Sequence, residues 1–286
     1  MKTFRFKLFL ALCGLSLFLG VKTFYDKKSS QSYPPSKVSL LSIKKELKNY
    51  STADLYTMLS AGEEILKWNE TLQKHHTHIV SEVLKKKGTF YEKRHYPLDD
   101  TFDWDTYSQY YYHAHRGGEH GHFHLFLRQG GMSKGASPIY YNPHNKTFSD
   151  IDTYAHLIAI SMNEKGQPLS LFTTNSWVTG EDWYGASDVK QMISRFHVTH
   201  SHPSHIVNMW LDAMLILFRP QIERLIEKRD EVIQKHGKGG DFKEVLEKRS
   251  LEVISKCEIS IDAQIRAIKE YLDESKEDKD PPYLKI

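Results

Sequence analysis

The spacing of apolar residues divides the chain into a helical segment, a β-rich middle and a helical C-terminal third. Between residues 51 and 87 the apolar side chains recur every three or four positions, which is the period of an amphipathic helix. Ser51 and Asp54 have the spacing of a capping box at its start, and Gly88 follows as the expected end. One long helix is therefore predicted over 51–87. Three histidines are expected on its solvated side: His75, His76 and His78.

In the middle of the chain, residues of the same type recur at every second position, which is the period of a β-strand. Gly117-Gly118 suits a two-residue hairpin turn, because both central positions of such a turn can need a positive φ. This turn, or a four-residue loop over 116–119, predicts the same three facing pairs: His115 with His120, His113 with His122, and Tyr111 with His124. A three-residue loop would shift the register by one residue and put the two sets of histidines on opposite faces.

The other face of this hairpin is apolar and is expected to pack on the core. It carries Tyr110, Tyr112, Ala114, Phe123, Leu125 and Leu127. A second hairpin is predicted from the segments 156–162 and 168–174 on either side of a turn at 163–167. The predicted fold class is α+β, with a central antiparallel sheet of at least four strands (two hairpins) packed against N- and C-terminal helices.

The C-terminal third has helical spacing throughout. A short helix is predicted over 186–196 and a long one after Pro203. Pro220 must kink or break this long helix, because proline lacks the amide hydrogen that a helix interior uses. After a turn at 237–240, a last long helix is predicted over 241–274, and any interruption of it is expected near Ile259.

Five of the sixteen histidines fall between residues 113 and 124, and the predicted hairpin puts all five on one face. Imidazole is the commonest metal-ligating side chain, so this face predicts a site for a divalent transition metal. Zn²⁺, Fe²⁺, Cu²⁺ and Ni²⁺ all accept histidine ligands, and the sequence does not choose among them. The candidate ligands are His113, His115, His120, His122, His124 and His156. Glu119 is the candidate catalytic residue, either as a fourth ligand or as the general base.

Three functions are compatible with this face. In a metalloenzyme, His113, His115 and His122 would hold an ion that activates water or O₂. A non-catalytic metal-binding module would use four or five histidines and leave no open coordination position. A structural or interaction domain would use the face as a polar or pH-sensitive surface without an ion. Neither the substrate nor the oligomeric state follows from the sequence.

His113, His115 and Glu119 also have the ligand spacing of the first cupin motif, in which a later histidine completes the metal site. His144 or His156 would be that later ligand. The glycines that flank the cupin motif are missing and no second motif follows, so the similarity is one of ligand spacing alone.

Composition excludes several other classes. With 39 basic and 36 acidic residues the net charge is +3, so no global basic field indicates a nucleic-acid partner. Cys13 lies in the apolar N-terminal run, which leaves Cys257 without an intrachain disulfide partner and excludes a cysteine-based zinc site. No phosphate-binding loop or nucleophile elbow is found.

The first residues are typical of a targeting segment. Three basic residues precede an apolar run of 14 residues from Leu8 to Val21, and lysines follow it. A signal-anchor or signal peptide is therefore expected over 1–24, which would export the domain to the bacterial envelope or hold it at the membrane. A flexible linker over 25–50, one α+β domain over 51–275 and a frayed tail over 276–286 complete the expected organisation.

Several motifs of the chain resemble those of a bacterial family that is known only as a domain of unknown function. The matching segments are 109–116 (QYYYHAHR), 119–124 (EHGHFH), 156–162, 171–175 (LFTTN), 177–181 (WVTGE), 183–184, 218–222 and 262–265. The resemblance covers roughly 60–270 and leaves out the N-terminal leader. It implies a single domain and carries no activity over to this chain.

Overall fold

The structure is a computed structural model that describes residues 38–85, 88–143, 153–237 and 241–277. The predicted leader, most of the predicted tail and His144 lie outside these residues. Among the described helices, none combines the length and the apolar character that crossing a membrane requires.

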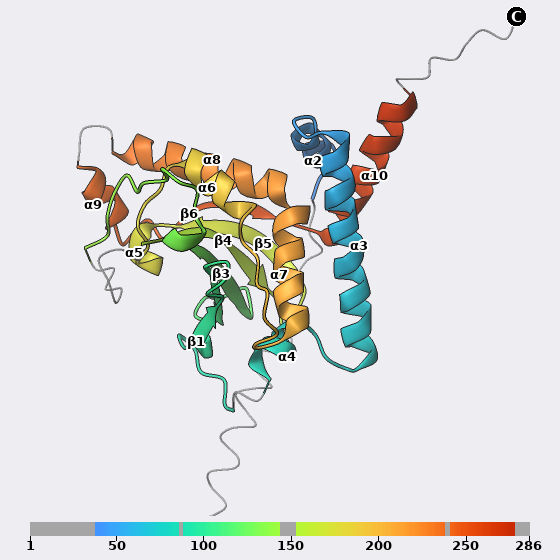
Figure 1. Cartoon of the computed structure of the whole chain (residues 1–286), viewed down its shortest axis with the longest axis horizontal. Helices are drawn as coiled ribbons and strands as arrows, with labels where there is room; N and C mark the ends of the chain where they lie inside the picture. The colour runs from blue at the N-terminus through green and yellow to red at the C-terminus, as the bar shows by residue number, and fades with distance from the viewer. Residues whose placement is uncertain (1–37, 86–87, 144–152, 238–240, 278–286) are drawn as a thin grey trace, which may run out of the picture. The chain divides into compact units, whose positions relative to one another are not determined.

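One antiparallel sheet of six strands forms the centre of the described domain (Figure 1). Its strands are β1 (Tyr96–Phe102), β2 (Ser108–His113), β3 (Gly121–Arg128), β4 (Tyr154–Met162), β5 (Pro168–Thr174) and β6 (Val253–Glu258). Neighbours in the sheet follow the order of the chain, and every neighbouring pair is antiparallel. Strands β2–β3 and β4–β5 are the two predicted hairpins, so the α+β fold class is confirmed. Strands β1 and β6 add one edge on each side.

Helices cover one face of this sheet. They are α6 (Ala186–Ile193), α7 (His205–Leu217) and α8 (Arg219–His236). The predicted apolar face of the first hairpin lies under them: Phe123 contacts Trp210 of α7 with ring centroids 6.2 Å apart. Tyr110 donates a hydrogen bond from its hydroxyl to Asn208 on the same helix. The alternation of β2 and β3 therefore turns the remaining side chains of these strands to the opposite face.

A second helical layer packs against α7. It contains α3 (Thr52–Lys74), α10 (Ile261–Glu277) and α2 (Leu40–Leu47), with α4 (Ile79–Leu84) between α7 and β1 (Figure 1). The predicted capping box is confirmed, because Ser51 Oγ accepts from the Asp54 amide and the Asp54 carboxylate accepts from the Ser51 amide, both at 3.1 Å. Short segments complete the fold: 3₁₀ turn η1 (Gln129–Gly131), α5 (Ser176–Thr179) and α9 (Phe242–Leu246).

The prediction of one helix over 51–87 is wrong beyond Lys74. The chain turns at His76, which has a φ of 54°, and the imidazole of His78 then accepts from the Ser81 amide as the N-cap of α4. Two of the histidines expected on a solvated helix face therefore form a turn and a cap. Side-chain capping competes with helix continuation in a way that apolar spacing does not reveal.

The linker prediction is wrong for residues 40–47, which form α2. Ile43 and Leu47 of this helix are buried against the second helical layer. Ser39 begins the helix as its N-cap. Two buried apolar side chains were too few to distinguish this helix from a polar linker in the sequence.

The prediction of one helix over 241–274 is also wrong. The segment contains α9, strand β6 and α10 in succession. Strand β6 pairs along the free edge of β5 and buries Ile254, and these contacts are available only in the folded sheet. By contrast, the predicted break at Pro220 is confirmed, because α7 ends at Leu217 and Pro220 stands in the first turn of α8.

Candidate metal centre

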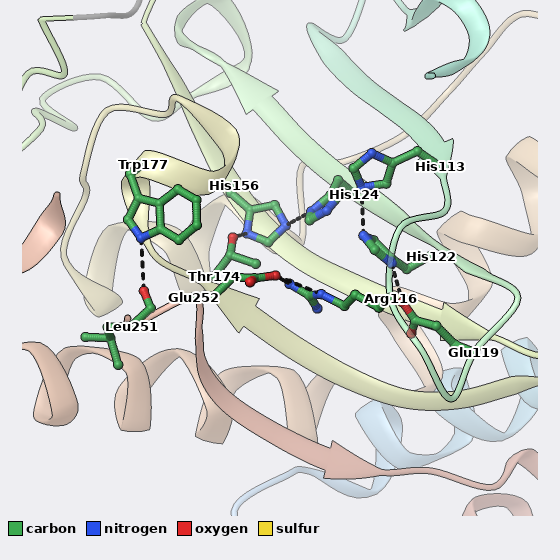
Figure 2. A network of polar contacts seen from close by, with 10 residues as sticks. All are labelled: His113, Arg116, Glu119, His122, His124, His156, Thr174, Trp177, Leu251 and Glu252. Atoms are coloured by element: carbon green, nitrogen blue, oxygen red, sulfur yellow. Dashed lines mark hydrogen bonds and ion pairs between the residues drawn. The ribbon is translucent and has the colours of Figure 1, made fainter. Parts of the chain in front are cut away.

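His113, His122 and His124 lie on the sheet face opposite the one that Phe123 packs against α7, and Figure 2 shows their side chains gathered together. In the β2–β3 register His113 is opposite His122 and Tyr111 is opposite His124, as predicted. His122 and His124 are fully buried, whereas His113 is half-buried. The face is therefore closed over β3 and partly open over the end of β2.

Three imidazoles converge where β2 ends and β3 begins. One nitrogen from each of His113, His115 and His122 lies within 4.8 Å of the others, a grouping that could hold a metal ion. The Nε2 atoms of His113 and His122 face each other 2.7 Å apart. Two imidazole lone pairs repel at this distance, so one nitrogen must carry a proton or both must share a cation. We call these three residues the histidine triad.

Glu119 lies behind His122 and fixes its orientation. The Oε1 atom of Glu119 lies 2.5 Å from His122 Nδ1, and its Oε2 atom accepts from the hydroxyl of Ser161. A carboxylate on Nδ1 holds the hydrogen on that nitrogen and leaves the Nε2 lone pair directed at His113. Both oxygens of Glu119 are thereby hydrogen-bonded, and Glu119 is not in the group of residues whose ligand atoms converge.

The protonation states suit metal binding. Burial lowers the pKa of His113 to about 2, assisted by repulsion from His122 and His115, and burial also lowers the pKa of His115 and His122. Burial alone would raise the pKa of Glu119, but its hydrogen bonds with His122 and Ser161 contribute to a net lowering of this pKa. At neutral pH the triad is therefore neutral and its supporting carboxylate is ionised, which is the state that binds a cation.

His124 and His156 form a separate buried pair deeper along the face. His124 Nδ1 lies 3.0 Å from His156 Nε2, and His156 Nδ1 lies 3.4 Å from Thr174 Oγ1 (Figure 2). The ring of His124 is 4.8 Å from that of His122, but its Nε2 atom has no partner among the described residues. Burial lowers the pKa of both, that of His156 to about 3. The two predicted ligands thus bond to each other beside the triad.

His120 does not join the other histidines, and its predicted pairing with His115 is wrong. The β2–β3 ladder stops at His113 and His122, so neither residue is paired across the hairpin. The His120 ring stacks on Phe90 at 5.4 Å, and its Nδ1 lies 2.6 Å from the hydroxyl of Tyr112, which belongs to the apolar face. Residues 114–120 lie outside both strands, so the alternation of faces along β2 and β3 does not extend to His120.

Ser161, Arg116 and Glu252 belong to the site and were missed in the sequence. Ser161 lies opposite His122 in the β3–β4 register, so correct pairing of the two predicted hairpins would have found it. Arg116 forms an ion pair with Glu252, which precedes β6. No sequence signal joins these two residues, because they are 136 positions apart.

The fold and the site together define an α+β domain whose sheet carries a histidine triad with a supporting carboxylate. The chain belongs to the family described as a domain of unknown function, DUF6969, which matches residues 59–259. The match includes all six strands and the triad, and it confirms the predicted relationship to a domain of unknown function. No curated protein and no solved structure matches the chain.

Proposed function

We propose that this domain binds one divalent transition metal ion through His113, His115 and His122. The observation that carries the proposal is the 2.7 Å approach of two Nε2 atoms, with a third imidazole nitrogen nearby and a carboxylate on the far side of His122. Histidine ligands of metals commonly donate a hydrogen bond from their other ring nitrogen to a carboxylate in this manner.

A small tetrahedral ion requires the three ligand nitrogens to shift from their observed separations. Zn–N bonds of about 2.0–2.1 Å require ligand nitrogens about 3.3 Å apart in a tetrahedron. The His113–His122 separation of 2.7 Å would have to widen by about 0.6 Å, and His115, whose ligand nitrogen lies within 4.8 Å of the other two, would have to adjust to the same spacing. Half-buried His113 and His115 would supply these shifts, while buried His122 is held by Glu119.

Three protein ligands leave an open coordination position. Metal ions with such a position take a water molecule and lower its pKa, which is the basis of metal-assisted hydrolysis. Among the described residues, the imidazole nitrogens that lie within 4.8 Å of one another belong to His113, His115 and His122, and neither His124 nor His156 is in this group. The geometry therefore supports a catalytic centre better than a closed, purely structural metal site.

Metal content tests the proposal. The full chain is treated with a chelator, dialysed and titrated separately with Zn²⁺, Fe²⁺, Cu²⁺ and Ni²⁺, with elemental analysis after gel filtration. We expect one equivalent of at least one metal in the native protein and much less in His122→Gln. His120→Gln is the matched control, because it changes a histidine of the same hairpin that faces away from the triad. Absence of stoichiometric metal in the native protein, or full occupancy in His122→Gln, would overturn the proposal.

A further inference from the structure

Arg116 lies directly beside the histidine triad, in the loop between β2 and β3. Its guanidinium lies over the ring of Phe172, 4.6 Å from the centroid, and the same ring contacts His122 at a centroid distance of 5.3 Å. Phe172 therefore sets the position of the guanidinium relative to a triad ligand. Figure 2 shows the side chain of Arg116 running past His122 toward Glu252.

The ion pair between Arg116 and Glu252 uses only part of each group. Arg116 Nε donates at 2.9 Å and Nη2 also donates, both to the single oxygen Oε1 of Glu252. Among the described residues, the Nη1 atom of Arg116 donates to no protein oxygen. A guanidinium is a planar fork that binds carboxylate or phosphate oxygens in pairs, so this one retains donors for another oxyanion.

The two partners differ in how firmly they are held. The side chain of Arg116 is 18% exposed and rests on an aromatic ring, whereas that of Glu252 is 41% exposed. An exposed carboxylate leaves such a pair at small cost, because water solvates it well. Glu252 can therefore move away while Arg116 stays in place beside the triad.

The charges around the triad also favour an anion once a metal is bound. Arg116 and Lys93 place positive charge near His115, and Glu119 and Glu252 place negative charge there. A divalent ion among neutral imidazoles would add two positive charges at this point. An ion of this kind dominates the local electrostatics and attracts anionic ligands.

We propose that Arg116 recognises an oxyanion, the carboxylate or phosphate group of the ligand or substrate, and holds it at the open position of the metal centre in place of Glu252. This inference rests on the proposed metal-binding function and adds the chemical class of the substrate. Arg116 is thus a specificity-determining residue. Glu252 competes with the anionic ligand for the guanidinium of Arg116.

The test uses the full chain loaded with Co²⁺, whose visible absorption changes when a ligand enters its coordination sphere. Acetate, inorganic phosphate and the uncharged acetamide are titrated into the native protein and into Arg116→Gln, Arg116→Lys and Glu252→Gln. We expect acetate or phosphate, and not acetamide, to change the native spectrum, and the preferred anion distinguishes a carboxylate from a phosphate ligand. Loss of a charge-assisted hydrogen bond should weaken that anion about ten- to a hundred-fold in Arg116→Gln. Binding should be intermediate in Arg116→Lys and tighter in Glu252→Gln.

The outcomes separate this inference from the proposed function. If neither Co²⁺ nor any of the four metals named above binds to the native protein, the metal-binding proposal fails and the inference fails with it. If one of those four binds and Co²⁺ does not, the same anion titrations are followed by calorimetry on the protein loaded with that metal. If Co²⁺ binds but no anion changes the spectrum, or if anion affinity is the same in Arg116→Gln as in the native protein, only the role of Arg116 is refuted. Glu252→Gln keeps the test decisive if Arg116→Gln does not fold, since unchanged anion affinity in that variant contradicts the competition.

Discussion

The buried histidine pair makes a quantitative prediction about stability in acid, and His156 is its most direct probe. Burial lowers the folded-state pKa of His156 to about 3, below the value of about 6.5 expected in the unfolded chain. The unfolded state therefore binds a proton in the range between pH 6.5 and 3 that the folded state does not bind. The stability that the neutral ring contributes is fully present above pH 6.5 and is lost as pH falls through this window.

The magnitude follows from proton linkage. Each such histidine costs up to about 1.4 kcal/mol of unfolding free energy per pH unit, so lowering the pH from 7 to 5 removes about 2 kcal/mol for His156. Buried Glu181 acts with the opposite sign, because burial raises its pKa to about 8 and its stabilisation is lost as pH rises. Comparing two proteins that both contain Glu181 removes its contribution from the difference.

The perturbation is therefore His156→Gln, measured in the metal-free protein with a chelator present. Urea unfolding followed by circular dichroism at pH 7 and pH 5 gives the loss of unfolding free energy for each protein. We expect this loss to be about 2 kcal/mol smaller in His156→Gln than in the native chain. Ile158→Val is the control: Ile158 is buried in the same strand, and its truncation lowers stability by about 0.5–1.5 kcal/mol without removing a titrating group.

A result in which His156→Gln and the native protein lose the same free energy between pH 7 and pH 5 would refute this reasoning. It would mean that His156 is protonated in the folded protein or reaches water there. If Ile158→Val also reduced the loss, the effect would reflect lower stability in general and not the titration of His156.

Two further substitutions test the support of the triad. Glu119→Ala leaves the buried Nδ1 of His122 and the hydroxyl of Ser161 without their partner. A competition titration should therefore show metal affinity about 10- to 100-fold below the native value. The loss should be smaller in Glu119→Gln, because the amide oxygen can still accept from His122. Unchanged affinity in Glu119→Ala would place the metal elsewhere. Gly121→Ala puts a Cβ atom 2.5 Å from the carbonyl oxygen of His113 and 2.6 Å from the hydroxyl of Tyr112. Thermal unfolding should therefore show a free energy of unfolding that is lower by about 1–3 kcal/mol. A native melting temperature would contradict the close approach.

The sequence was sufficient for the parts of the fold that local periodicity controls. Strict alternation in β2 and β3 predicted both faces of the hairpin, since one face is apolar and a register shift by one residue would bury the wrong side chains. The same alternation brought His113 and His122 together correctly. The break at Pro220 also needed no information beyond the chain itself.

The remaining parts depend on contacts between distant segments. His120 leaves the histidine face because Phe90 and Tyr112 receive its ring, and because Met162 accepts its amide hydrogen at 2.8 Å. Strand β6 exists because β5 offers an unpaired edge, and the pair Arg116–Glu252 exists because β6 brings residue 252 to the hairpin loop. Phe90, Met162, strand β6 and Glu252 all lie outside the window in which hydrophobic periodicity is informative.

Protons and metal ions both bind to imidazole nitrogens, the groups that gather on this sheet face. Burial keeps the imidazoles of the triad neutral, which prepares them for a cation but makes the metal-free fold sensitive to acid. A metal present at a hundred times its dissociation constant would stabilise the folded state by about 2.7 kcal/mol, which is comparable to the acid loss calculated for one histidine. The metal-loaded protein should therefore unfold at lower pH than the metal-free protein, while His122→Gln should show the same acid midpoint with and without metal. Because His156 lies outside the triad, His156→Gln should keep the metal-dependent shift, and this separates the contribution of the deeper pair from that of the proposed metal centre.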